Sequence, residues 1–234
     1  MASSPRLLIT AGPTYEPIDA VRFIGNRSSG KLGASLADHA ADRGWGVRLL
    51  LGPNAACPES GRVEVIPFES TADLEHALHE HLAWCDCLVM AAAVADYRPA
   101  PTETDPGGKR RRTGDGLRLE LEATPDLLEG CARGRRGGQL LVGFALEPRD
   151  ELHASARRKL ERKGIDLIVA NPLETMDSDA IEAWLIGHAD GGPVEAYTGG
   201  TIPKTAFGPW LLDAIEPMVC RADAPREQAT DAAS

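Results

Sequence analysis

The stretch Gly25-Asn26-Arg27-Ser28-Ser29-Gly30-Lys31-Leu32-Gly33, with the apolar run Leu7-Leu8-Ile9-Thr10-Ala11-Gly12 before it, decides the fold. The apolar run predicts a buried strand, and the later stretch predicts a turn that opens a helix. A helix start leaves backbone N–H groups unpaired and carries partial positive charge. Two serine hydroxyls, a glycine and a lysine at that point therefore favour binding of a phosphate or another small anion.

Outward from this stretch, apolar runs alternate with helical patterns. The patterns predict strands at 6–11, 47–51, 63–67, 87–94, 117–121, 140–145 and 166–170, and helices at 28–43, 71–82, 151–163 and 201–218. They also predict a late β-hairpin from 183–187 and 194–197. Strands alternating with helices predict an α/β fold with a Rossmann-like, doubly wound, mostly parallel sheet. We expect a single domain over residues 1–220 and a flexible tail at 221–234.

Composition excludes several classes of protein. The 234 residues carry a formal net charge of −10, which argues against a non-specific nucleic-acid binder because such proteins need a basic surface. No apolar run approaches the roughly 20 residues of a membrane span, and no signal-peptide core precedes the first strand. The five scattered cysteines are typical of reduced thiols. We therefore expect a cytoplasmic protein with no nucleic-acid or membrane partner.

A carboxylate follows the most apolar run of the chain. Residues 87–94 predict a central strand buried on both faces, and Asp96 stands just beyond its end. Open α/β sheets bind their ligands at the carboxyl ends of the strands, so Asp96 is a candidate ligand contact. A purely structural role in a turn is the alternative. Further along, Thr124-Pro125-Asp126 predicts a helix start with Thr124 as cap and Pro125 in the first turn.

Cations recur in two places. A long loop at 99–116 contains Lys109-Arg110-Arg111-Arg112, and the helix at 151–163 has Lys159 and Lys163 one turn apart. The loop is either a flap that closes over phosphates or a solvated charge run, and spacing does not decide between them. Spacing suggests a nucleotide or phosphate-ester site formed by these cations and the following residues: Asn26, Ser28, Ser29, Gly30 and Asp96. Leu32 stands where a P-loop needs Ser or Thr, which disfavours a P-loop ATPase.

Three stretches carry a resemblance to a known family: Thr10-Ala11-Gly12-Pro13-Thr14-Tyr15-Glu16-Pro17-Ile18-Asp19, Val21-Arg22-Phe23-Ile24 with the stretch that opens this section, and Met90-Ala91-Ala92-Ala93-Val94-Ala95-Asp96-Tyr97-Arg98-Pro99. They closely resemble phosphopantothenoylcysteine synthetase (phosphopantothenate–cysteine ligase), a family of coenzyme A biosynthesis. Gly143-Phe144-Ala145, the stretches at 159–164 and 166–171, and Pro203-Lys204 extend the match. The resemblance covers about residues 6–216.

The resemblance implies a two-step ligation. CTP activates 4′-phosphopantothenate to an acyl-cytidylate with release of pyrophosphate, and the amine of cysteine then displaces CMP to form the amide. It further implies Mg²⁺ carried by the nucleotide phosphates, and a homodimer with its site near the subunit interface. Many bacterial members are fused to a flavin-dependent decarboxylase, so a separate decarboxylase is an expected partner in the pathway.

Carried over by position, the resemblance assigns roles to individual residues. Asn26 would bind the acyl-nucleotide intermediate, with Arg22 supporting the same site. Lys109 or Arg111 of the flap would supply the cation of the first step. Lys159 and Lys163 would hold the base or phosphates. The remaining contacts to the nucleotide would come from Gly12, Ser28, Ser29, Gly30, Ala92, Asp96, Thr124, Pro125, Asp126, Leu127 and Phe144.

The chain also departs from the family pattern. Lys109-Arg110-Arg111-Arg112 replaces the usual Lys-Ile-Lys-Lys, and Thr124 and Pro172 stand where the family usually has Asn and Asp. These changes leave open whether CTP or ATP is the nucleotide. Two other functions stay as alternatives: an NAD(P)H- or flavin-dependent reductase on a Rossmann-like fold, and a nucleotide-binding protein without catalysis.

Overall fold

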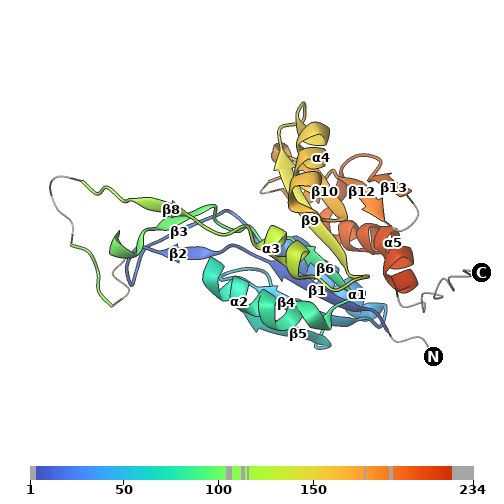
Figure 1. Ribbon diagram of the computed structural model, residues 1–234, viewed down its shortest axis with the longest axis horizontal. Helices are drawn as coiled ribbons and strands as arrows, with labels where there is room; N and C mark the ends of the chain where they lie inside the picture. The colour runs from blue at the N-terminus through green and yellow to red at the C-terminus, as the bar shows by residue number, and fades with distance from the viewer. Residues whose placement is uncertain are drawn as a thin grey trace, which may run out of the picture.

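The computed structural model describes residues 4–103, 107–111, 114, 116–176, 178–189 and 192–222. Within this part of the chain, an eight-stranded sheet has the order β13-β12-β10-β9-β6-β1-β4-β5 (Figure 1). Every pair from β10 to β5 is parallel, whereas β12 and β13 run antiparallel to their neighbours. The bounds are β1 (Arg6–Ala11), β4 (Gly46–Leu51), β5 (Val63–Pro67), β6 (Cys87–Met90), β9 (Leu140–Glu147), β10 (Leu167–Pro172), β12 (Trp184–Ala189) and β13 (Gly192–Tyr197). The predicted doubly wound, mostly parallel sheet is confirmed.

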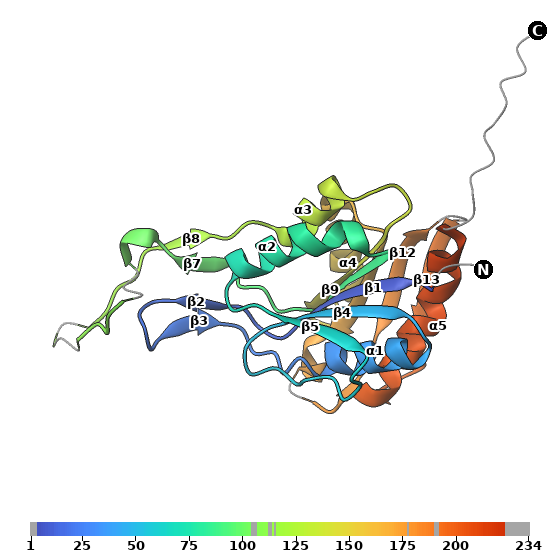
Figure 2. The ribbon, with the colours of Figure 1, turned by 90° about the horizontal axis from the view of Figure 1, so that it is seen from below.

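Helices cover both faces of the sheet (Figure 2). One face carries α1 (Lys31–Asp42) and α5 (Lys204–Ala222), and the other carries α2 (Thr71–His81), α3 (Leu127–Gly134) and α4 (Leu152–Lys163). Successive β1 residues point to opposite faces, so Leu7 packs with Leu36 of α1 and Leu8 packs with Leu74 of α2. Burial on both faces explains the continuous apolar runs of the central strands.

Helix α1 lies very close to β1. A Cβ added to Gly33 would lie 2.4 Å from the Cβ of Ala11, a distance that no side chain there would tolerate. Gly30 precedes α1 with φ +68°, in the left-handed region that favours glycine. The stretch that opens the helix therefore uses one glycine for its turn and another for close packing. Together they fix the start of α1 at the carboxyl end of β1.

Two short hairpins project beyond the carboxyl ends of the sheet (Figures 1 and 2). They are β2 (Tyr15–Pro17) with β3 (Phe23–Gly25), and β7 (Tyr97–Pro99) with β8 (Leu121–Ala123). We call these four strands and their connecting loops the arm. The backbone amide of Ala20 donates to the Gly108 carbonyl (3.0 Å), so the basic loop lies against the β2–β3 turn. A further small pair, β11 (Ala180–Ile181) with β14 (Ile202–Pro203), precedes α5.

Several predicted boundaries are wrong. Asp126, not Thr124, caps α3: its carboxylate accepts from the Glu129 amide, while the Thr124 hydroxyl donates to the Ala95 carbonyl. The predicted strand at 117–121 lies instead at β8, and the strand at 87–94 ends at Met90. The helix expected at 28–43 begins at Lys31, and the last helix runs Lys204–Ala222. Residues 223–234 of the predicted tail lie outside the described residues. Arg112 of the basic loop also lies outside them.

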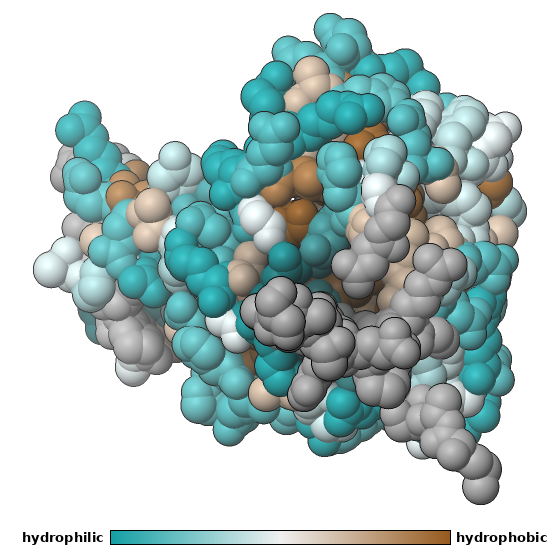
Figure 3. Space-filling model, turned by 45° about the vertical axis from the view of Figure 1, so that its right-hand side comes forward, coloured by the Kyte–Doolittle hydropathy of each residue, from teal (hydrophilic) through white to brown (hydrophobic). Residues whose placement is uncertain are grey.

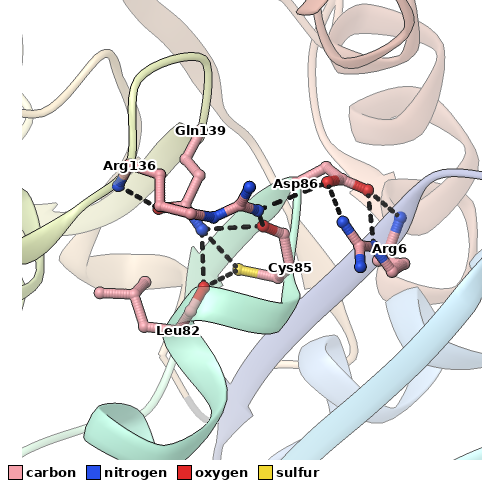
Figure 4. A network of polar contacts seen from close by, with 6 residues as sticks. All are labelled: Arg6, Leu82, Cys85, Asp86, Arg136 and Gln139. Carbon is pink, nitrogen blue, oxygen red and sulfur yellow. Dashed lines mark hydrogen bonds and ion pairs between the residues drawn. The ribbon is translucent and has the colours of Figure 1, made fainter. Parts of the chain in front are cut away.

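The amino ends of the strands are tied by a polar network (Figure 4). The Gln139 side-chain amide donates to the carbonyls of Leu82 (2.6 Å) and Cys85 (2.8 Å), and its oxygen accepts from the Arg136 amide (2.6 Å). Asp86 accepts from the backbone and guanidinium of Arg6. Gln139 is buried, so its bonds replace the water that these carbonyls would otherwise bind.

Other findings concern surface and burial. Most of the face shown in Figure 3 is hydrophilic, and hydrophobic residues appear mainly in a recess and on the arm at the left. Cys85 and Cys87 are buried and have free thiols. Within the described part of the chain, no helix has the length and apolar composition needed to cross a membrane.

Candidate functional site

A cavity of about 880 Å³ opens at the carboxyl ends of β1, β6, β9 and β10. Thirteen of the predicted site residues line it: Asn26, Ser28, Ser29, Gly30, Ala92, Asp96, Thr124, Pro125, Asp126, Leu127, Phe144, Lys159 and Lys163. Residues from five separate stretches of the chain therefore meet in one place. The volume is that of an ordinary small-molecule site.

The start of α1 forms one wall of this cavity, through Lys31, Leu32 and Gly33. No side chain caps the helix at Gly30, so the first turn keeps the partial positive charge of its amides. The turn before the helix is held by the loop that contains Ala56, whose amide donates to the Ser29 carbonyl (2.8 Å). This wall suits an anion.

Three hydrogen bonds hold the loop after β6, residues 91–96, against the rest of the cavity. The Asn26 side-chain amide donates to the Val94 carbonyl (2.8 Å). The Thr124 hydroxyl donates to the Ala95 carbonyl (2.5 Å), and the Thr124 amide donates to the Asp96 carbonyl (3.0 Å). Asn26 and Thr124 thus both hold the loop, and Asp96 at its end lines the cavity.

The two lysines of α4 each have a carboxylate partner. Lys159 Nζ lies 2.5 Å from Glu147 Oε1, and Lys163 Nζ lies 3.1 Å from Asp126 Oδ1. Partial burial raises the pKa of Glu147, but the hydrogen bond and charge of Lys159, with smaller effects of Ser155 and Arg158, together lower it by more, so the net shift is downward. Glu147 is therefore ionised at neutral pH and holds Lys159 in place.

Lys31, whose position at the helix start favours an anion, lines the cavity, together with residues that were not predicted: Arg162, Asn171, Thr175, Met176 and Lys204. Lys31 Nζ lies 2.9 Å from Asp179 Oδ1, and the hydrogen bond and charge of Lys31, with a smaller effect of Lys204, lower the pKa of that carboxyl. Asn171 could have been predicted as a site residue, because it is a polar residue at the end of a buried strand.

Four predicted site residues do not line the cavity: Gly12, Arg22, Lys109 and Arg111. Gly12 (φ +85°) lies beneath the loop that contains Ala55. Arg22, Lys109 and Arg111 belong to the arm. Arg22 forms a 3.2 Å ion pair with the buried carboxylate of Asp19 and donates to the Arg110 carbonyl (3.1 Å). Lys109 and Arg111 are exposed.

Asp19 joins the two hairpins of the arm. Its Oδ1 accepts from the amides of Val21 (2.9 Å) and Arg22 (2.8 Å), and its Oδ2 accepts from the Arg110 amide (3.2 Å). Burial raises the pKa of Asp19, but these hydrogen bonds and the Arg22 charge lower it by more. An ionised Asp19 thus fixes the basic loop and Arg22 relative to each other.

The fold and the cavity define an α/β protein with a cavity at the carboxyl ends of a parallel sheet whose walls suit an anion. The family model "DNA/pantothenate metabolism flavoprotein C-terminal domain" matches residues 2–213. The chain belongs to this family, which includes the phosphopantothenoylcysteine synthetase part of bifunctional coenzyme A biosynthesis proteins.

Individual relatives agree with this assignment. The chain is 42% identical over 222 residues to the coenzyme A biosynthesis bifunctional protein CoaBC of Mycobacterium tuberculosis, covering 90% of this chain and 51% of the relative. It thus spans about half the length of that relative. A crystal structure of the C-terminal domain of a CoaBC protein aligns with a TM-score of 0.74 at 34% identity, over 92% of this chain and 95% of that one. A Cab2 mutant in complex with phosphopantothenate-cysteine shares the fold (TM-score 0.73, 19% identity, 93% and 88% covered).

Proposed function

We propose that this protein is a phosphopantothenate–cysteine ligase that uses CTP. The observation that carries the proposal is the meeting, in one cavity, of Asn26, the uncapped start of α1, Asp96, Phe144 and the two α4 lysines. Family membership supports the same reaction class. The cavity walls supply amides, cations and carboxylates, a set suited to binding and orienting anions.

The proposed chemistry has two steps. A carboxylate oxygen of 4′-phosphopantothenate attacks the α-phosphorus of CTP, and pyrophosphate leaves. The amine of cysteine then attacks the acyl carbon, CMP leaves with the bonding electrons, and the amine loses a proton. Both steps bring anions together, so the protein acts by orientation and by offsetting charge. Asn26 would contact the acyl-nucleotide, and Lys159 and Lys163 would contact the nucleotide.

Mg²⁺ fits this site as an ion carried by the triphosphate. Among the described residues, no three His, Cys, Asp or Glu side chains come together in a group that would hold a metal ion. Asp96 and Asp126 line the cavity and would be available to the ion's bound water molecules. When present, Mg²⁺ would neutralise charge on the β- and γ-phosphates.

We further propose a homodimer in which the arm reaches the partner's cavity. Among the described residues, ten large apolar side chains are exposed, and five of them lie on the arm: Val21, Phe23, Tyr97, Leu117 and Leu121. Hydrophobic residues on the arm are visible at the left of Figure 3. Exposed apolar side chains gathered on one projecting element are typical of an interaction site. Such a dimer would also bring the partner subunit's Arg22 to a cavity that the Arg22 of the same subunit does not line.

The nucleotide assay comes first. Pyrophosphate release is measured with CTP or ATP, in the presence of phosphopantothenate and Mg²⁺, with and without cysteine. Faster release with CTP, and amide formation that depends on cysteine, would support the proposal. Oxidation of NAD(P)H without CTP would instead indicate a reductase, and tight CTP binding without turnover would indicate a non-catalytic binding protein.

The dimer is tested by subunit mixing. Asn26→Ala and Arg22→Ala proteins, each of low activity alone, are combined under conditions that exchange subunits. If the arm acts on the partner's cavity, half of the dimers are mixed and each has one intact site, so about a quarter of wild-type activity returns. If the arm serves its own cavity, none returns. Light scattering gives the oligomeric state independently.

The setting of the reaction follows from its substrates. We propose a cytoplasmic enzyme acting on charged metabolites of coenzyme A biosynthesis. Its product would pass to a flavin-dependent decarboxylase, the kind of domain to which bacterial family members are often fused. Adding such a decarboxylase to the assay should consume the amide product without changing the rate of pyrophosphate release.

A further inference from the structure

Three buried polar side chains outside the cavity form a connected group. Thr14 and Thr71 have no exposed surface, and Glu16 is 3% exposed. Glu16 Oε1 accepts from the Thr71 hydroxyl (2.6 Å) and from the Thr71 amide (2.8 Å). The hydroxyl oxygens of Thr71 and Thr14 are 3.3 Å apart. The group therefore runs from a carboxylate, through two hydroxyls, toward the loop after β6.

The group ends on the loop after β6. The Ala95 amide donates to Thr14 Oγ1 (2.9 Å), and the Thr14 amide donates to the Ala93 carbonyl (3.2 Å). Thr14 thus holds this loop on both sides of Val94, the residue whose carbonyl accepts from Asn26. Asp96 follows immediately and lines the cavity.

Capping of α2 accounts for only part of the role of Glu16, which accepts from the Thr71 amide at the start of that helix but also from the Thr71 hydroxyl. Ser70 already caps that helix, in a capping box with Asp73 that satisfies the Ser70 and Asp73 amides. A buried carboxylate carries a desolvation cost and accepts hydrogen bonds only. Glu16 accepts the Thr71 hydroxyl hydrogen and so holds the Thr71 side chain beside Thr14, whose Oγ1 accepts from the Ala95 amide.

We propose that Thr14 is a positioning residue for the ligation site, held in its rotamer by Thr71 and Glu16. Its hydroxyl fixes the Ala95 amide and thereby sets where Asp96 and the wall at 92–96 face the bound nucleotide. The inference rests on the proposed function for its effect on turnover, but the contact itself can be measured without any substrate.

The test compares Thr14→Val, Thr14→Ser, Thr71→Val and Glu16→Gln with Thr198→Val as the matched control. The Thr198 hydroxyl also accepts a backbone amide, from Ala183 (3.1 Å), but does not line the cavity. The readouts are amide hydrogen exchange at Ala95, thermal stability, and kcat and KM measured separately.

In Thr14→Val we expect exchange at Ala95 to rise about tenfold or more and kcat to fall about tenfold, since a buried amide loses its partner. Thr14→Ser should restore both to within about threefold, and Glu16→Gln should give a smaller effect in the same direction. Thr198→Val should leave kcat unchanged. Should Thr14→Val fail to fold, Glu16→Gln and Thr71→Val carry the comparison.

Unchanged exchange at Ala95 in the Thr14 and Thr71 variants would overturn the inference, as would a kcat loss in Thr14→Val no larger than in Thr198→Val. If the wild-type protein does not form the amide product from phosphopantothenate and cysteine, the proposed function is wrong. The exchange measurement would still decide whether Thr14 positions the loop.

Discussion

The Asn26 side chain donates a 2.8 Å hydrogen bond to the Val94 carbonyl, joining the turn before α1 to the loop after β6. These two segments form facing walls of the cavity. One side chain therefore ties the turn before α1 to the loop after β6.

Asn26→Ala should stall the second step of the ligation. The variant loses both the bond to Val94 and the amide proposed to contact the acyl-nucleotide, so pyrophosphate release should continue while amide formation falls about 100-fold. Quenched mixtures should contain accumulated acyl-nucleotide. Asn26→Asp, which cannot donate to Val94, is the companion variant and should behave similarly. Full-rate amide formation in Asn26→Ala would remove its assigned role.

The arm cations should differ in importance. Lys109→Ala and Arg111→Ala each remove one positive charge from the exposed basic loop, and only the cation that approaches the triphosphate should matter. We expect one variant to lose pyrophosphate release by about 100-fold and the other by less than about threefold. Arg118→Ala, an exposed change further along the same connection, is the control. Equal retention of activity in both variants would exclude the loop from the first step.

Gly33→Ala should disturb the site through packing. The new methyl group would lie 2.4 Å from the Ala11 Cβ, so α1 must move away from β1 and carry the anion-binding turn with it. We expect a loss of about 1–3 kcal/mol in the free energy of unfolding and weaker CTP binding. Gly130→Ala in α3, where a Cβ meets nothing within 4 Å, should instead be neutral or stabilising by up to about 1 kcal/mol. Equal changes in the free energy of unfolding of the Gly33→Ala and Gly130→Ala variants, measured by chemical denaturation, would contradict this account.

The thiols should react unequally. Burial raises the pKa of Cys85 to about 12 and that of Cys131 to about 11, and it raises the pKa of Cys87 well above its ordinary value. Because only the thiolate reacts, these three should resist alkylation at pH 8 in the folded protein, whereas exposed Cys57 should react readily. Peptide mass spectrometry after a timed iodoacetamide pulse gives each rate. Rapid labelling of Cys85 or Cys87 without unfolding would count against the packed sheet.

The sheet could be predicted from sequence because its strands are buried on both faces, so runs such as Leu7 to Ala11 are apolar throughout. The arm could not, because three-residue strands like β2 and β3 carry too few residues for a period to appear. The sequence predicts the wrong cap for α3 because the Thr124 hydroxyl can also form its hydrogen bond with another segment, and here it donates to the Ala95 carbonyl.

Most of the candidate site was also predictable, because polar residues at the ends of parallel strands must converge. Its electrostatic pairing was not. Glu147 and Asp126 come from different elements than the lysines they hold, and no spacing rule connects them. Nor does sequence reveal that Arg22 lies outside the cavity, since that depends on the direction in which a hairpin leaves the sheet.

The polarity of α5 has a practical consequence. Lys204 at its start lines the cavity, whereas Met218 lies near its other end beside Gln139 and His188, at the amino ends of the strands. Ser4 enters β1 at that same end. A tether attached at Ser4 or close to Met218 would therefore leave the mouth of the cavity facing solution, an arrangement suited to surface-based measurement of the proposed nucleotide affinity.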